Sequence, residues 1–241
     1  MQRGIVFDGD DTLWNTEWLY DDARRRARDA VEAAGFDGVS WEETERRIDV
    51  ENVERLGHGV LRFPTSCAEG YEAVCAAAGR KVEPAVRQRI VDVASTVFER
   101  QAPLVPHARE TLTELASRGI RLALLTKGDP MIQCRRIDQS GLAPLFDLVE
   151  IVERKTPEDI RALIERLGVS ADDALMVGNS VRSDVLPSLL AGVKPIWIDA
   201  HVWEYERQHE ALPDEGVIEL HDLTELLDLV DVNAAYWICR S

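Results

Sequence analysis

Short, mostly apolar runs alternate with stretches of helical periodicity over much of this chain. Apolar runs bounded by Gly, Pro or polar residues predict strands that are buried in a sheet. These runs cover residues 4–7, 120–125, 146–152, 174–177, 195–198 and 217–220. Between them, helical spacing predicts helices over 108–117, 130–139, 157–167, 183–191 and after Asp222. Strands that alternate with helices indicate an α/β fold with a doubly wound parallel sheet.

A long helical stretch interrupts this alternation after the first strand. The pattern predicts helices over 17–34, 41–56, 66–78 and 84–100, with no convincing strand among them. For the second of these helices, Ser40 is expected as the N-cap and Glu43 as its partner in a capping box. We therefore expect an α/β core domain of residues 1–15 and 104–241, with a small all-helical domain of residues 16–103 inserted after the first strand.

Composition narrows the class of protein. The chain has 241 residues, of which 45% are hydrophobic, so it can bury a substantial core. A net charge of -16 argues against binding to nucleic acid or to an acidic membrane, because phosphate backbones attract basic surfaces. The four cysteines form no CxxC pair, and no run of about 18 apolar residues occurs. We expect a soluble cytoplasmic protein with free thiols.

The segment FDGDDTLW, residues 7–14, places carboxylates at Asp8, Asp10 and Asp11 directly after the first predicted strand. Two such charges about 6 Å apart repel by roughly 3 kcal/mol at an effective dielectric near 20. A fold keeps this repulsion at a strand end only if something offsets it. A hard cation with oxygen ligands is the obvious candidate.

Other strand ends carry matching chemistry. Thr126 ends the strand at 120–125, and Lys155 follows the strand that ends near residue 152. Asn179 follows the strand at 174–177, and Asp184 comes five residues later. Since ligands of open parallel sheets bind beyond the carboxyl ends of the strands, these groups are expected to meet at one rim. The sequence therefore predicts an oxyanion site with a metal.

Four of these segments together resemble the motifs of the haloacid dehalogenase (HAD) superfamily, in its phosphatase branch with a helical cap. FDGDDTLW is similar to the first motif, hhhDxDxT, and LALLTKGD to the second, an apolar strand that ends in Thr or Ser. ERKTPE resembles the third and MVGNSVRSD the fourth. The motifs occur in the order of the family, and the resemblance spans residues 5 to about 198.

This resemblance implies a mechanism. Asp8 would attack phosphorus to form an aspartyl-phosphate, and Asp10 would protonate the leaving alkoxide and later take a proton from water. Thr126 and Lys155 would hold the transferring oxygens and stabilise their charge. The implied cofactor is Mg²⁺, and its implied ligands are Asp8, the backbone carbonyl of Asp10, Asn179 and Asp184.

The fourth motif departs from the usual pattern, because Asn179 stands where many relatives carry Asp. An amide oxygen ligates a hard cation without adding negative charge, so whether Asn179 or Asp184 binds the metal directly stays open. Lys127 and Trp14 are expected to contact the substrate. The helical insert corresponds to the cap of the family, which closes over the rim and expels water.

Three alternatives stay open. A phosphosugar mutase needs the same residues, whereas a 2-haloacid dehalogenase needs the nucleophile but neither Asp10 nor Asp184. The alternative outside enzymes is a phospho-receiver signalling module, which has about half this length and no helical insert. The substrate is expected to be a small phosphorylated metabolite, and the sequence does not indicate which one. The protein is expected to be a monomer or a homodimer.

Overall fold

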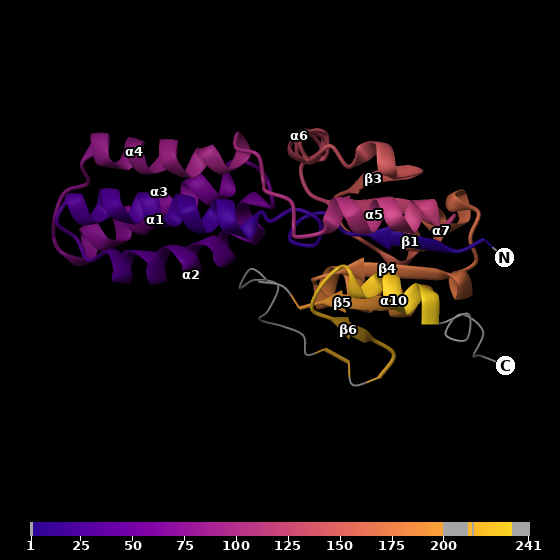
Figure 1. Ribbon diagram of the computed structural model, residues 1–241. Coiled ribbons are helices and arrows are strands. Elements are labelled where there is room, and N and C mark those ends of the chain that lie inside the picture. The colour runs from indigo at the N-terminus through magenta and orange to yellow at the C-terminus, as the bar shows by residue number, and fades with distance from the viewer. Residues whose placement is uncertain (1, 200–211, 214, 233–241) are drawn as a thin grey trace. The chain divides into compact units, whose positions relative to one another are not determined.

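The computed structural model describes residues 2–199, 212–213 and 215–232. The chain divides into two compact units, one formed by residues 1–16 together with 102–241 and the other by residues 17–101. The first unit is built around a sheet and the second consists of helices (Figure 1). The two units are described separately below.

A six-stranded sheet forms the centre of the first unit. Its spatial order is β3-β2-β1-β4-β5-β6, and all of its pairs are parallel. The strands are β1 (Gly4–Phe7), β2 (Arg121–Lys127), β3 (Leu148–Val152), β4 (Ala174–Gly178), β5 (Lys194–Ile198) and β6 (Ile218–Leu220). This arrangement confirms the predicted doubly wound α/β fold. Because β1 is central, Asp8 lies between the ends of β2 and β4.

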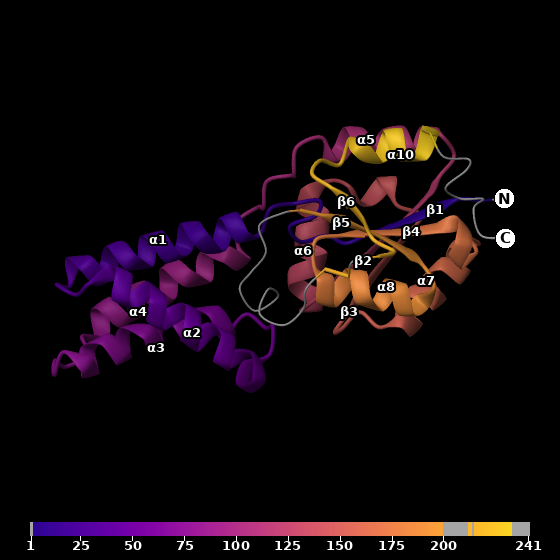
Figure 2. The same ribbon diagram turned by 90° about the horizontal axis from the view of Figure 1, so that it is seen from below.

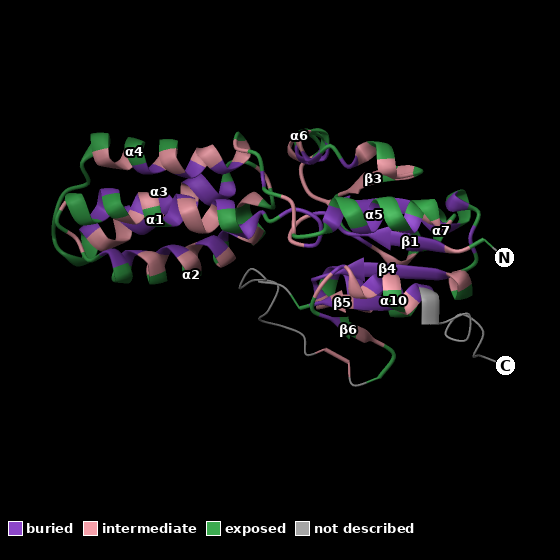
Figure 3. Ribbon diagram, viewed as in Figure 1, coloured by how far each residue is buried: buried purple, intermediate pink, exposed green. Residues whose placement is uncertain are grey.

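Helices cover both faces of the sheet. The helices α5 (Ala108–Ser117) and α10 (Glu225–Val232) lie side by side on one face, whereas α7 (Pro157–Leu167) and α8 (Leu186–Ala191) cover the other (Figure 2). Helix α6 (Pro130–Ser140) contacts β3. The central strands β1 and β4 are buried along their whole length (Figure 3). Strands buried on both faces read as continuous apolar runs, which is why the sequence showed them clearly.

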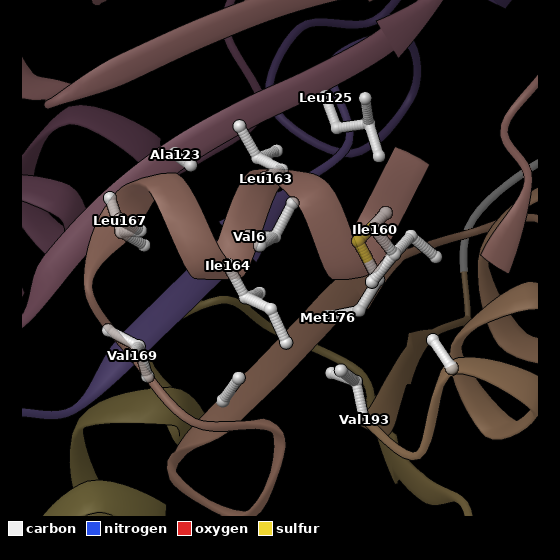
Figure 4. Packing of buried hydrophobic residues seen from close by; sticks show 12 residues of the cluster. Val6, Ala123, Leu125, Ile160, Leu163, Ile164, Leu167, Val169, Met176 and Val193 are labelled. Carbon is white, nitrogen blue, oxygen red and sulfur yellow. The ribbon is translucent and has the colours of Figure 1, made fainter. Parts of the chain in front are cut away.

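One cluster of the core lies between the sheet and α7 (Figure 4). Helix α7 begins with Pro157 at its first position and a capping box between Thr156 and Asp159, both of which favour a helix start. Its apolar stripe is fully or almost fully buried against side chains of β1, β2 and β4. The facing residues are Ile160, Leu163, Ile164 and Leu167 on α7 and Val6, Ala123, Leu125 and Met176 on the strands.

The second unit is a bundle of four helices. These are α1 (Glu17–Ala33), α2 (Gly38–Leu56), α3 (Arg62–Ala77) and α4 (Pro84–Ser95), followed by a short 3-10 helix at Thr96–Phe98. Helix α1 contacts α2 and α4, and α3 contacts the same two helices. The helices were predicted from their periodicity, and the structure confirms that each exists.

Two helix starts in this unit differ from the prediction. Helix α2 begins at Gly38, with Asp37 as its N-cap, so the predicted capping box of Ser40 and Glu43 is wrong. A Cβ on Gly38 would lie 2.2 Å from Glu32 Oε1 and 2.6 Å from Arg28 Cγ, so a larger residue there would require these side chains of α1 to move. Helix α3 begins at Arg62 rather than at the predicted position 66.

The segment after β4 also differs from a simple helix. Residues Val181–Val185 form a π-helical turn before α8 begins at Leu186. Short 3-10 turns lie at Ala143–Leu145 and Ala171–Asp173. No helix in the described part of the chain is long and apolar enough to cross a membrane.

Candidate active site

The loop after β1 turns sharply at Gly9. The Gly9 carbonyl accepts a hydrogen bond from the Leu13 amide at 2.8 Å, and the Asp8 amide donates to the Val177 carbonyl of β4 at 2.9 Å. A Cβ on Gly9 would lie 2.4 Å from the Trp14 ring, so the close turn requires glycine. This backbone fixes Asp8 at the end of the sheet and Asp10 two residues beyond it.

Lys155 joins two of the predicted acids. Its ammonium group donates to Asp8 Oδ1 and, at 2.6 Å, to Asp184 Oδ1. All three side chains are buried. Burial raises the pKa of Asp8 to about 7, although Lys155 opposes the shift and Asp184 adds to it. Burial alone would lower the pKa of Lys155, but the carboxylates of Asp184 and Asp8 raise it above its ordinary value, so the ammonium stays charged.

The turn after β4 holds Asp184 in place. Its Oδ2 accepts a hydrogen bond from the Ser180 amide at 3.0 Å, and the Ser180 hydroxyl accepts one from the Ser183 amide at 3.0 Å. A Cβ on Gly178 would lie 2.3 Å from the Asp184 carboxyl carbon. The glycine of the fourth motif is therefore needed so that the carboxylate can fold back over the end of β4.

A hydroxyl of the first motif connects Asp8 with Asn179. Thr12 Oγ1 lies 3.2 Å from Asp8 Oδ2 and 3.3 Å from Asn179 Oδ1, so its proton can be donated to either oxygen. Trp197 fixes the backbone of the same asparagine by donating to its carbonyl at 2.8 Å. The amide oxygen of Asn179 thus lies on the side of Asp8 Oδ2, whereas Lys155 contacts Oδ1.

Thr126 and Lys127 end β2 beside these residues. The Thr126 side chain is 1% exposed, and its Oγ1 has no hydrogen-bond partner among the described residues. That hydroxyl would lie 3.3 Å from a Cβ on Gly9, next to the Asp8 backbone. Lys127 Nζ donates to Ser183 Oγ at 2.6 Å, which ties the second motif to the fourth. A buried hydroxyl without a partner can donate to a bound oxyanion.

Asp10 is held by side chains that the sequence prediction missed. Its Oδ1 accepts from Trp14 Nε1 at 2.7 Å, and its Oδ2 accepts from Gln133 Nε2 at 2.9 Å and from Arg136 Nη1 at 2.6 Å. Trp14, predicted to contact the substrate, is buried and donates to Asp10. Its contact with a substrate stays a prediction.

The missed residues left weak signals in the sequence. Gln133 and Arg136 lie on one face of α6 with Ile137 and Ser140, at positions a helix buries. The signal in the sequence is a polar residue and a charged residue at core-facing positions of the helix that follows the second motif. Thr12 is the last residue of the hhhDxDxT motif, yet no role was predicted for it.

The chemistry of the donor set fits a hard divalent cation. Thr12 contacts oxygens of Asp8 and Asn179, and Lys155 contacts an oxygen of Asp184. The side chains of Asp8, Asn179 and Asp184 are all buried. One ammonium faces two carboxylates, so negative charge is left over where burial already disfavours it. Oxygen ligands with excess negative charge suit Mg²⁺.

The matches to known proteins agree with this geometry. The sequence model of the haloacid dehalogenase-like hydrolase family matches residues 2–192. A phosphoserine phosphatase of Thermus thermophilus is 32% identical over 189 residues, which are 70% of this chain and 75% of that protein. A glyceraldehyde 3-phosphate phosphatase of Methanopyrus kandleri is 28% identical over 95% of this chain and 97% of that protein.

A solved structure shares the fold over nearly the full length. A haloacid dehalogenase-like hydrolase from Xanthomonas campestris superposes with a TM-score of 0.77 and 25% identity, covering 99% of this chain and 95% of that one. The chain belongs to the haloacid dehalogenase-like hydrolase family. Its curated relatives support an enzyme of the phosphatase class, a hydrolase of phosphoric monoesters.

Proposed function

We propose that this enzyme is a Mg²⁺-dependent phosphatase that hydrolyses a small phosphomonoester through an aspartyl-phosphate on Asp8. The observation that carries the proposal is the contact of Lys155 with both Asp8 and Asp184, next to the unpaired hydroxyl of Thr126. The nucleophile Asp8, the ammonium group of Lys155 and the hydroxyl donor of Thr126 thus lie close to one another at the end of a buried sheet.

The residues that would hold the metal are Asp8, the backbone carbonyl of Asp10, Asn179 and Asp184. When bound, Mg²⁺ screens the repulsion between the attacking carboxylate and the phosphate dianion. Asp8 Oδ2 is suited to face the cation, because Oδ1 already accepts from Lys155. Thr12 orients this oxygen and that of Asn179 in the same region.

The residues of the chain divide the reaction into two displacements. In the first, an Asp8 oxygen forms a bond to phosphorus while the bond to the leaving oxygen breaks and Asp10 gives its proton to that oxygen. In the second, water attacks phosphorus, its proton passes to Asp10, and the bond to Asp8 breaks to release inorganic phosphate. Thr126 and Lys155 donate to the transferring oxygens, whose charge grows in each transition state.

The helical unit would act as the cap of this active site. The domain limits proposed from the sequence are 1–15 with 104–241 for the core and 16–103 for the cap. We assign to the cap the exclusion of water and the choice of substrate. Since the curated relatives are named for phosphoserine and glyceraldehyde 3-phosphate, the substrate class is a small phosphorylated metabolite. The proposed location is the cytoplasm, without nucleic acid or membrane as a partner.

The alternatives within the family differ in one respect each. A 2-haloacid dehalogenase has no leaving alkoxide to protonate, so the acid Asp10 and the buried Asp184 favour the phosphatase. A phosphosugar mutase uses the same groups and differs in excluding water from the intermediate. Release of inorganic phosphate, as opposed to transfer of phosphate to a second hydroxyl, separates these two activities.

Chelation and one variant test the proposal. Turnover of 4-nitrophenyl phosphate is expected to stop in excess chelator and to return when Mg²⁺ is added. Asp8→Asn is expected to lose turnover by at least about 10³-fold while keeping the thermal unfolding midpoint close to that of the wild type, because an amide cannot attack phosphorus. Asp172→Asn, an exposed acid of a 3-10 turn, is the matched control. Sustained activity in chelator, or in Asp8→Asn, rejects this mechanism.

A further inference from the structure

The Asp10 carboxylate has an unusual set of contacts for a group that transfers protons. Three side-chain donors occupy its two oxygens, namely Trp14 Nε1, Gln133 Nε2 and Arg136 Nη1, at 2.7, 2.9 and 2.6 Å. The carboxylate itself is 28% exposed, so it has an open side. The donors therefore fix the direction in which the open side of Asp10 points.

Arg136 is buried although it belongs to a helix at the edge of the unit. Its side chain is 8% exposed, and its ion pair with Asp10 spans 126 residues of sequence. Removing a guanidinium group from water is costly unless a charged partner compensates for it. Asp10 compensates for the burial of Arg136, and the same contact fixes the orientation of the Asp10 carboxylate.

Gln133 connects the same carboxylate to the phosphate-binding segment. Its amide nitrogen donates to Asp10 Oδ2 and, at 2.9 Å, to the backbone carbonyl of Lys127. Lys127 directly follows Thr126 at the end of β2. A Cβ on Gly128 would lie 3.1 Å from the same Gln133 nitrogen, so the loop packs closely on this side chain. Asp10 and Thr126 are in this way kept at a fixed separation.

We propose that Arg136 and Gln133 are positioning residues that hold Asp10 at the leaving oxygen of the substrate. The inference rests on the proposed function, because it assumes that Asp10 protonates the leaving group. Proton transfer requires donor and acceptor within hydrogen-bond reach, and a misplacement of about 1 Å costs on the order of 10²-fold in rate. Without the contacts to α6, Oδ2 of Asp10 would lose both of its donors, and only Trp14 would restrain the side chain.

The leaving group provides a readout that a purely structural role would not change. A good leaving group departs without a proton, whereas a poor one needs it. We therefore compare kcat/KM for 4-nitrophenyl phosphate and for phenyl phosphate, since kcat/KM reports the transfer of phosphate to Asp8. Arg136→Met is expected to lower kcat/KM about 30-fold for phenyl phosphate and less than about 3-fold for 4-nitrophenyl phosphate.

Further variants isolate the effect. Arg136→Lys is expected to recover part of the loss, since it keeps the charge and one donor. Arg135→Met removes the same charge from an exposed position on α6 and is expected to leave both substrates unaffected. Gln133→Met is close in shape to the original side chain, and it is expected to lower kcat/KM more for phenyl phosphate than for 4-nitrophenyl phosphate, as Arg136→Met does. It takes the place of Arg136→Met in the test if that variant does not fold.

A double variant completes the test. If Arg136 acts through Asp10, then adding Arg136→Met to Asp10→Asn lowers kcat/KM no further than Asp10→Asn alone. Equal losses for the two substrates, or losses that multiply in the double variant, overturn the inference. The proposed function fails separately, through chelator-resistant turnover or an active Asp8→Asn enzyme, so the two failures are distinguishable.

Discussion

Each unit of this enzyme buries a group of charged side chains, and the two groups resolve their charge differently. At the end of the sheet, Lys155 lies between Asp8 and Asp184, while Arg136 pairs with Asp10. In the helical bundle, Arg24 pairs with Glu45, and Arg62 pairs with Asp49. Apart from the partly exposed Asp10, the residues of both groups are buried, so burial of ion pairs does not by itself define an active site.

In the helical group, each of the buried carboxylates Glu45 and Asp49 has an arginine partner, and Arg24 lies within 3.9 Å of both. Arg24 Nε donates to Glu45 Oε2 at 3.0 Å, and its guanidinium lies 5.0 Å from the centre of the Phe63 ring. Glu17 is a further buried carboxylate of this unit, and burial raises its pKa to about 7. A proton can therefore neutralise Glu17 near neutral pH.

The group at the sheet leaves its excess charge within reach of further oxygen ligands. Asp8 and Asp184 share one ammonium group, and the amide oxygen of Asn179 and the unpaired hydroxyl of Thr126 belong to the same end of the sheet. The oxygens gathered there suit a divalent cation and a phosphate. Neutral oxygen ligands beside the charged pair, rather than burial of charge or a raised pKa, distinguish this candidate catalytic site from the ion pairs of the helical unit.

Removal of Lys155 is expected to have the largest effect. Lys155→Met leaves Asp8 and Asp184 facing each other without a cation, so kcat is expected to fall by at least about 10³-fold. The free energy of unfolding in chelator is expected to fall by about 3–5 kcal/mol, and Mg²⁺ is expected to restore part of it. Urea unfolding with and without Mg²⁺ measures this. Lys81→Met, an exposed lysine, is the control. Equal effects of both variants would contradict the comparison.

Removal of Arg24 is expected to change stability but not chemistry. Arg24→Met leaves Glu45 buried without its partner, which is expected to cost about 3–5 kcal/mol in urea unfolding, with chelator-sensitive turnover retained by the folded protein. Adding Glu45→Gln should return a large part of that stability. Arg25→Met, whose side chain is 66% exposed, is expected to cost less than about 1 kcal/mol. If the folded Arg24→Met enzyme has lost turnover, the group is not purely structural.

Glu17 is expected to make stability depend on pH. Its pKa is raised from 4.5 to about 7 in the folded chain, mainly by burial, so between these values the native state binds more protons than the unfolded state. The free energy of unfolding is therefore expected to fall by about 2 kcal/mol as pH rises from 5 to 8. Glu17→Gln removes this contribution, so the difference between variant and wild type should grow with pH. A difference that is the same at pH 5 and pH 8 would refute the assignment.

Removal of the Thr12 hydroxyl is expected to have the smallest effect. Thr12→Val deletes the group between Asp8 Oδ2 and Asn179 Oδ1, so the Mg²⁺ concentration needed for half-maximal activity is expected to rise about tenfold. The rate at saturating Mg²⁺ should change little, because Thr12 is not proposed to touch the substrate. Thr12→Ser keeps the hydroxyl and should behave as the wild type. An unchanged Mg²⁺ requirement in Thr12→Val would show that the contact is unimportant for the metal.

Much of the architecture could be predicted from local patterns. The limits of α5 and α7 agree with the prediction residue for residue. Both helices have apolar stripes, and α7 also has a capping box and a proline at its start, whereas no side chain caps α5. The start of α2 was missed, because two capping residues, Asp37 and Ser40, stand close together. In the structure, Asp37 accepts from the amides of Val39 and Ser40, and a local pattern with two candidate caps does not show which of them does so.

The amino-acid sequence by itself determined the order of strands and helices and the residue types at the strand ends, because periodicity and motif spacing are properties of neighbouring residues. Only the tertiary structure decided that Lys155 faces both Asp8 and Asp184, and that Arg136 holds Asp10. These contacts join segments up to 147 residues apart. Which side chains meet over such separations depends on how the strands are ordered in the sheet, and a local pattern does not encode that order.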